Sequence, residues 1–118
     1  MPDNAAYFTF TYPPTPERFT IQLTDPAKIQ HARNILNGTE TREIHVGGRI
    51  IKRQVPYNRD WSFHLDPNSI DFFERAVEVS DAHIQQVEHH LDEAGGAFLP
   101  DLMWAPFGSR LEREVHFA

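Results

Sequence analysis

The chain has 118 residues, no cysteine and a net charge of −6 at pH 7. Its size predicts one domain, and its composition excludes disulfides, thiolate metal sites and thiol nucleophiles. No apolar run approaches the roughly 18 residues of a membrane span, and the first residues lack the basic-then-apolar order of a signal peptide, so we expect a soluble, cytoplasmic protein without a membrane partner.

Two strands with an alternating pattern open the chain. Residues 7–12 (YFTFTY) and 18–24 (RFTIQLT) alternate apolar and polar side chains, as half-buried strands do. The proline-rich stretch PPTPE between them cannot continue a strand pair, so it predicts a turn and an antiparallel hairpin. The side chains expected to point inward are Phe8, Phe10, Phe19, Ile21 and Leu23.

A helix and a third strand are predicted next. The Asp-Pro pair at residues 25–26 is typical of a helix start, and the Asn-Gly pair at residues 37–38 supplies a left-handed end. An apolar stripe at helical spacing lies between them. Residues 43–53 (EIHVGGRIIKR) are predicted to form a strand that is bulged or bent at Gly47 and Gly48.

The middle of the chain predicts a second strand pair. Residues 61–65 (WSFHL) alternate, and a turn follows them. Residues 70–79 (IDFFERAVEV) fit either a helical stripe or a strand. A strand is favoured, because its pairing with residues 61–65 would bring large apolar side chains together, such as Leu65 opposite Ile70.

A second helix and a last strand complete the predicted elements. Ser80 or Asp81 is the expected helix cap, and the glycines at residues 95–96 end the helix. Residues 97–107 carry two prolines and no clean period, so they should lie over the core as an extended segment. A final strand is expected at about residues 109–116.

Together these elements predict an α+β fold. We expect a single compact domain over residues 1–118, with a mainly antiparallel sheet of about five to six strands and two helices packed on it. The first helix should cross between the second and third strands.

Several longer motifs are similar to one known family. FTIQLTDPAKIQHARNILNGTE, WSFHLDP and HLDEAGGAFLP, followed by Trp104, resemble the calmodulin-binding-protein N-terminal-domain-like proteins, which are small proteins of bacteria and amoebae. The resemblance covers about residues 7–115 and implies a binding function, with no catalytic residues to transfer. Such proteins often carry two cysteines, where this chain has Ser80 and Ala105, and many look secreted.

The charge distribution bears on the partner. Residues 1–59 carry a net charge of +3 and residues 60–118 a net charge of −9, and no stripe of basic and aromatic residues appears, so nucleic acid is not expected. Calmodulin targets are basic amphipathic helices, whereas the second predicted helix is acidic and the first is short. Tight calmodulin binding is therefore not expected, and the partner is an unknown small molecule, peptide or protein.

His64 is the strongest single candidate for chemistry. Its imidazole lies on the polar face of an aromatic strand, with Asp66 nearby and Asp71 predicted across the hairpin, so it could act as a base or a metal ligand. The alternative, which we favour, is a histidine that stiffens the hairpin through a hydrogen bond to a turn carboxylate.

A metal site is a weaker hypothesis. No cofactor is predicted, but a divalent metal could be held by His64 or by Glu78, which shares a predicted strand face with Glu74. The histidines of the second helix lack the i, i+4 spacing of paired zinc ligands.

Aromatic residues suggest a binding groove. The residues that could line it for a peptide or small ligand are Trp61, Phe98, Met103, Trp104 and Phe107. The leading interpretation is a non-catalytic binding domain whose expected contact surfaces are the segment 97–107 and the polar strand face around His64. The alternative is a small, metal-assisted or acid/base enzyme centred on His64 with carboxylates such as Asp66, Asp71 or Glu78.

Overall fold

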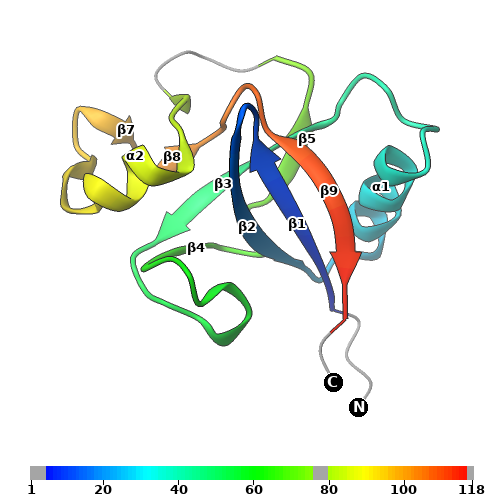
Figure 1. Ribbon diagram of the computed structural model, residues 1–118, viewed down its shortest axis with the longest axis horizontal. Coiled ribbons are helices and arrows are strands. Elements are labelled where there is room, and N and C mark those ends of the chain that lie inside the picture. Colours follow the sequence, from blue (N-terminus) through cyan, green and yellow to red (C-terminus); the bar gives the residue numbers. More distant parts are fainter. Residues whose placement is uncertain (1–4, 76–79, 117–118) are drawn as a thin grey trace.

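The computed structural model describes residues 5–75 and 80–116 and arranges them as two antiparallel sheets with two α-helices (Figure 1). The predicted α+β fold with two helices is confirmed, although the described strands form two antiparallel sheets and a separate two-stranded parallel pair, and not one sheet. The strands are β1 (Ala6–Tyr12), β2 (Thr15–Leu23), β3 (His45–Ile51), β4 (His64–Leu65), β5 (Asp71–Phe73), β6 (Ala94–Gly95), β7 (Phe98–Pro100), β8 (Met103–Trp104) and β9 (Arg110–Val115). The α-helices are α1 (Pro26–Leu36) and α2 (Ile84–His89). Two short 3-10 helices are η1 (Pro56–Asn58) and η3 (Leu91–Glu93).

The first sheet has the strand order β2-β1-β9, with both pairs antiparallel. Phe8 lies opposite Ile21 and Phe10 opposite Phe19, and all four side chains are fully buried. Alternation thus gave the correct inward face, and the predicted hairpin is confirmed. The last strand is confirmed too, since β9 pairs with the free edge of β1.

The second sheet is built around β3, which pairs with β4, β5 and β8, always antiparallel. The predicted hairpin between the strands at 61–65 and 70–79 is wrong, because Leu65 lies opposite Ile50 and not opposite Ile70. In the described residues, β4 and β5 each pair with β3 and not with each other. Of the strand predicted at 70–79, β5 forms the start, and residues 76–79 lie outside the described residues.

Hydrogen bonds in the turn between β4 and β5 explain this error. The backbone N–H of Asp66 donates to the carbonyl of Arg49 (2.9 Å), and the N–H of Arg49 donates to the hydroxyl of Ser69 (2.8 Å). The turn is closed by the Ser69 N–H, which donates to the Asp66 carbonyl (2.9 Å). These bonds keep the turn beside β3, so the chain continues along that strand and does not reverse upon itself.

Gly47 and Gly48 are explained by close packing. Gly47 pairs with β5 and Gly48 with β8, both without a register shift, so of the predicted bulge or bend the bulge is wrong. A Cβ on Gly47 would lie 3.0 Å from the Cβ of Ala105, and one on Gly48 would lie 3.2 Å from Cγ1 of Ile70. Glycine is present because neighbouring segments approach β3 closely here.

The first helix follows its sequence signals closely. The Asp25 carboxylate accepts from the N–H of Ala27 (2.9 Å), Pro26 is the first residue, and Gly38 has a φ of 86° just after the helix. Helix α1 connects β2 to β3 and lies beside β2 and β9 (Figure 1).

The second helix is shorter than predicted. Helix α2 begins at Ile84 after His83, which makes no side-chain cap, so the prediction of Ser80 or Asp81 as the cap is wrong. The Asp81 carboxylate instead accepts from the hydroxyl of Tyr12 (2.9 Å) and the N–H of Phe107 (2.9 Å). These long-range bonds hold this segment against β1 and the C-terminal chain.

Trp104 lies at the centre of the core. Its ring centroid is 5.8 Å from that of Phe10, 5.2 Å from that of Phe19 and 5.6 Å from that of Phe63. The core therefore continues from the first sheet to the second through one indole. In the described part of the chain, no helix has the length and apolar character needed to cross a bilayer.

Candidate functional site

His64 is buried and already bonded. Its side chain is 4% exposed, and Nδ1 lies 2.7 Å from the carbonyl oxygen of Arg53. Because a carbonyl only accepts, Nδ1 carries the proton and donates it there. The Tyr57 ring lies nearly perpendicular to the imidazole. Burial, assisted by Tyr7 and Asp66, raises the pKa of Tyr57 to about 12, so this neighbour stays neutral at physiological pH.

The two carboxylates predicted beside His64 have other partners. Asp66 accepts from the N–H of Asn68 (3.0 Å) within the turn, and Asp71 forms an ion pair with Lys28 of α1. Partial burial acts to raise the pKa of Asp71, but the hydrogen bonds from Lys28 and the Phe72 N–H outweigh it and lower the pKa. No hydrogen bond joins His64 to Asp66 or Asp71 in the described chain.

The five aromatic and sulfur side chains predicted to line a groove are dispersed. Trp61 and Trp104 are core residues whose indole N–H groups donate to the carbonyls of Arg18 (2.7 Å) and Ala82 (2.9 Å). Phe98 is half-buried, and its ring meets that of His90. Met103 and Phe107 are half-buried and border two separate hollows.

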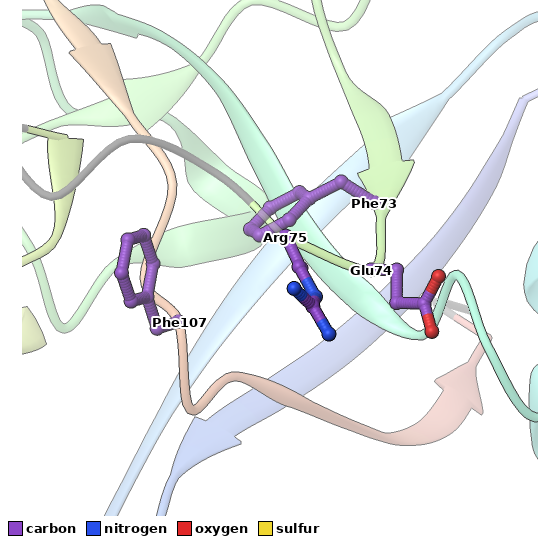
Figure 2. A pocket seen from close by; sticks show the side chains of 4 residues that line it. All are labelled: Phe73, Glu74, Arg75 and Phe107. Atoms are coloured by element: carbon purple, nitrogen blue, oxygen red, sulfur yellow. The ribbon is translucent and has the colours of Figure 1, made fainter.

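The hollow at Phe107 is small and largely apolar. The hollow has a volume of about 230 Å³, and its described lining residues are Phe73, Glu74, Arg75 and Phe107. Figure 2 shows that Phe107 comes from the segment after β8, whereas the other three side chains come from β5 and the residues that follow it. Among its described lining residues, two phenyl rings and one charge of each sign give no net preference for a charged ligand.

The hollow at Met103 is larger and combines apolar and cationic groups. Its volume is about 540 Å³. The residues that line it are Arg49, Lys52, Ala94, Gly95, Asp101, Leu102 and Met103. They come from β3 and the residue just after it, from β6, from the turn before β8 and from β8 itself, so segments far apart in sequence build one surface. We call it the β3-β8 hollow.

Arg49 and Lys52 give the β3-β8 hollow a local positive charge. Both are exposed, and neither side chain forms a hydrogen bond or ion pair with another described residue. Three other described cations are held by carboxylates, Arg18 by Glu112, Lys28 by Asp71 and Arg33 by Glu114. The two cations are therefore available to an anionic group from outside.

One wall of the β3-β8 hollow has an unusual backbone. Asp101 and Leu102 have φ values of 61° and 62°, in the left-handed region that bulky residues rarely adopt. The N–H of Leu102 donates to the carbonyl of Leu99 (3.0 Å), and the Leu102 carbonyl accepts from the N–H of Ile50 (2.8 Å). These bonds fix the wall to β3. Strain of this kind, on the order of 1–3 kcal/mol for each residue, clusters at ligand sites.

Of the residues lining this hollow, Met103 was singled out from the sequence. The sequence pattern places Arg49 and Lys52 in the strand predicted at residues 43–53. The net charge of +3 in residues 1–59 indicates that some cations of this half lack a carboxylate partner. What could not be anticipated was their position beside Met103, which depends on the pairing of β3 with β8.

The surroundings of the predicted metal candidates can be described for His64 alone. Glu78 lies outside the described residues, and Nδ1 of His64 is bonded to a carbonyl. Within the described chain, a group of three side chains able to reach one ion is formed by His31, Glu40 and Glu43. Their sequence spacing matches no common metal motif, so the sequence alone did not indicate them.

Comparisons with known proteins give one match. The family model described as the BP-74 N-terminal domain matches residues 4–118. No curated protein matches the chain, and no solved structure does.

Proposed function

The chain belongs to the BP-74 N-terminal domain family, and we propose that it is a binding domain that holds an acidic peptide segment of a protein partner in the β3-β8 hollow. The observation that carries this proposal is the pair of unpartnered cations, Arg49 and Lys52, beside the apolar side chains of Leu102 and Met103. Carboxylates of the partner would bind the cations, and complementary charge steers such an encounter.

The apolar side chains of the hollow determine which type of residue can lie next to the bound carboxylate of the peptide. Leu102 and Met103 are half-buried, and methionine adapts its flexible side chain to different partners. Leu102 also covers Gly95, where an added Cβ would lie 3.1 Å from Cδ2 of that leucine. An aliphatic side chain next to a carboxylate therefore fits this surface. Asp101 at the rim can accept from a backbone N–H of the same segment.

The hydrogen bonds of the buried polar side chains favour a binding function at the protein surface. Among the described residues, no buried side-chain nitrogen or oxygen lacks a hydrogen-bond partner. Active sites commonly hold polar groups that are left free for the substrate. The buried polar groups of this chain serve the fold instead, as Asn58 does when it accepts from the N–H of Thr20 (2.9 Å) and donates to the carbonyl of Phe63 (3.1 Å).

A charge reversal tests the proposal. With a fluorescein-labelled peptide of Gly-Glu-Leu repeats as the probe, the wild-type protein should bind with a Kd of about 10–100 μM. The double variant R49E/K52E should bind at least tenfold more weakly, a loss of about 1.4 kcal/mol or more. Added salt should weaken wild-type binding, because the cations are exposed. Fluorescence anisotropy measures all three effects.

The matched control is R110E/R113E, which makes the same change in net charge on exposed residues of β9. It should bind the probe nearly as well as the wild type. If the wild type does not bind the peptide, or if both double variants lose affinity equally, the β3-β8 hollow is not the binding surface.

We also expect no tight complex with calmodulin. Helix α1 has 11 residues, buries Ile29 and Ala32 against the protein and uses Lys28 and Arg33 in ion pairs, and α2 has 6 residues. Neither offers the free basic amphipathic helix that calmodulin encloses. Calorimetry with calcium-loaded calmodulin should give a Kd weaker than about 1 μM, which corresponds to roughly 8 kcal/mol. Submicromolar binding in a one-to-one complex would refute this expectation.

A further inference from the structure

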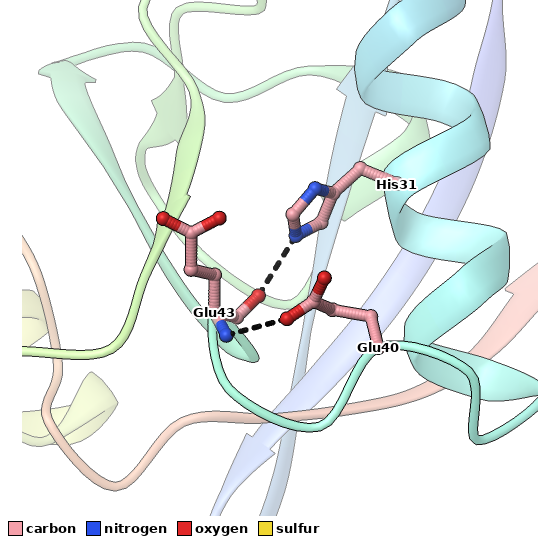
Figure 3. Close-up of side chains that lie close together, drawn as sticks. All are labelled: His31, Glu40 and Glu43. Carbon is pink, nitrogen blue, oxygen red and sulfur yellow. Dashed lines mark hydrogen bonds between the residues drawn. The ribbon is translucent and has the colours of Figure 1, made fainter.

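Three potential metal ligands converge between α1 and β3. His31 lies on α1, and Glu40 and Glu43 lie on the loop that leads from the helix to the strand (Figure 3). One ligand atom from each side chain lies within 4.8 Å of the other two. In a zinc site with bonds of about 2.1 Å, ligand atoms are about 3.4 Å apart. A modest movement of one side chain would therefore close the site.

The imidazole is held in place by its neighbours. The ring of His31 stacks on Phe72, with centroids 4.8 Å apart and planes inclined by 5°. Its Nε2 lies 2.8 Å from the carbonyl oxygen of Glu43. A metal at Nε2 would take the place of the ring proton, which in the neutral imidazole can move to Nδ1. The same carbonyl oxygen would then be a fourth donor.

The two carboxylates differ in their hydrogen bonds to the rest of the chain. Oε2 of Glu40 accepts from the N–H groups of Arg42 (3.0 Å) and Glu43 (2.9 Å). These backbone hydrogen bonds fix the position of the Glu40 carboxylate, and its Oε1 makes no bond to a described residue. The Glu43 side chain is exposed and has no hydrogen-bond partner in the described chain, so it is the ligand that can move.

We infer that His31, Glu40 and Glu43 bind a divalent cation of the zinc class. Two carboxylates balance a charge of +2, and the imidazole favours Zn²⁺, Co²⁺ or Ni²⁺ over Mg²⁺ and Ca²⁺, which prefer oxygen ligands alone. A hollow of about 390 Å³, lined by Glu40, Arg42, Glu43 and Glu74, borders the cluster and gives an ion access from solvent. The bound ion would clip the loop to α1, independently of the β3-β8 hollow.

Zinc titration of the tag-free protein by calorimetry tests this site. The wild type should bind one Zn²⁺ per chain, and its melting temperature should rise with added zinc, because an ion that binds only the folded state stabilises it. Glu43→Gln removes one ligand whose side chain makes no other described contact. His31→Phe removes the nitrogen and keeps a ring against Phe72. Each variant should bind zinc at least tenfold more weakly and lose the rise in melting temperature.

The matched control is Glu93→Gln, which disrupts the exposed His90–Glu93 pair near α2. It should bind zinc like the wild type. If the wild type takes up no zinc, or if Glu43→Gln and His31→Phe bind it with wild-type affinity, the three side chains serve only to shape the loop and the inference is refuted.

Discussion

Replacement of Trp104 by alanine is expected to lower the free energy of unfolding by about 3–5 kcal/mol. The indole, which belongs to β8 of the second sheet, is fully buried and contacts Phe10 and Phe19 of the first sheet and Phe63, just before β4. Its Nε1 donates to the carbonyl of Ala82 (2.9 Å), just before α2. Truncation therefore leaves a cavity where the sheets and the α2 segment meet, and it also leaves that carbonyl without its partner.

Urea denaturation measures the loss, with Trp104→Phe as the comparison. Phenylalanine keeps most of the ring volume but cannot donate to Ala82, so it should cost less than alanine, about 1–3 kcal/mol. A small domain has roughly 5–15 kcal/mol of stability, so the alanine variant should be close to unfolding at 37 °C. A loss below about 1 kcal/mol for Trp104→Ala would mean that the indole does not join the two sheets.

His64→Ala is expected to cost about 2 kcal/mol of stability. The imidazole is almost completely buried, its Nδ1 donates to the carbonyl of Arg53, and the Tyr57 ring packs nearly perpendicular to it. Removal of the ring leaves the carbonyl unpaired next to the end of β3. Since the zinc-class ligands lie elsewhere, zinc binding should be unchanged.

The control for this variant is His89→Ala, which truncates an exposed histidine of α2 and should change stability by no more than about 0.5 kcal/mol. Thermal and urea unfolding compare the two variants, and calorimetry gives their zinc affinity. Should His64→Ala keep wild-type stability and lose zinc uptake, His64 would be a functional ligand, and the enzyme interpretation would replace the structural one.

The elements that could be predicted are those whose signals are local. Alternation identified β1 and β2, and the cap of Asp25 with the left-handed Gly38 bounded α1 to within a residue or two. Each signal acts through neighbours in the chain, either as side-chain period or as a bond from a residue to the next turn. These elements could therefore be predicted without knowledge of the tertiary fold.

The errors all depend on contacts between distant segments. Asp81 looks like a helix cap in the sequence, but its carboxylate is bonded to Tyr12 and Phe107. Gly47 looks like a bulge, but the close approach of Ala105 accounts for it. The strand pair at residues 61–79 was assigned by matching apolar side chains, and β3 offered both segments a partner that the local pattern does not reveal.

The candidate site was predictable only in part, for the same reason. The segment around Met103 was named as a contact surface, yet its cationic side comes from Arg49 and Lys52, more than 50 residues earlier in the chain. That β3 pairs with β8 is decided by the whole core, with Trp104 opposite Gly48. The net charge of +3 in residues 1–59 shows that cations are in surplus in that half of the chain, but it cannot show which of them lack a carboxylate.

The proposed binding surface is tested most directly by a ¹⁵N–¹H NMR titration of the wild-type domain with the Gly-Glu-Leu repeat peptide. The amide shifts should change along the second half of β3 near Arg49 and Lys52 and along the wall at Asp101 to Met103. Shifts that gather instead around Tyr57 and His64, or that leave the β3-β8 hollow unchanged at saturating peptide, would contradict the proposal.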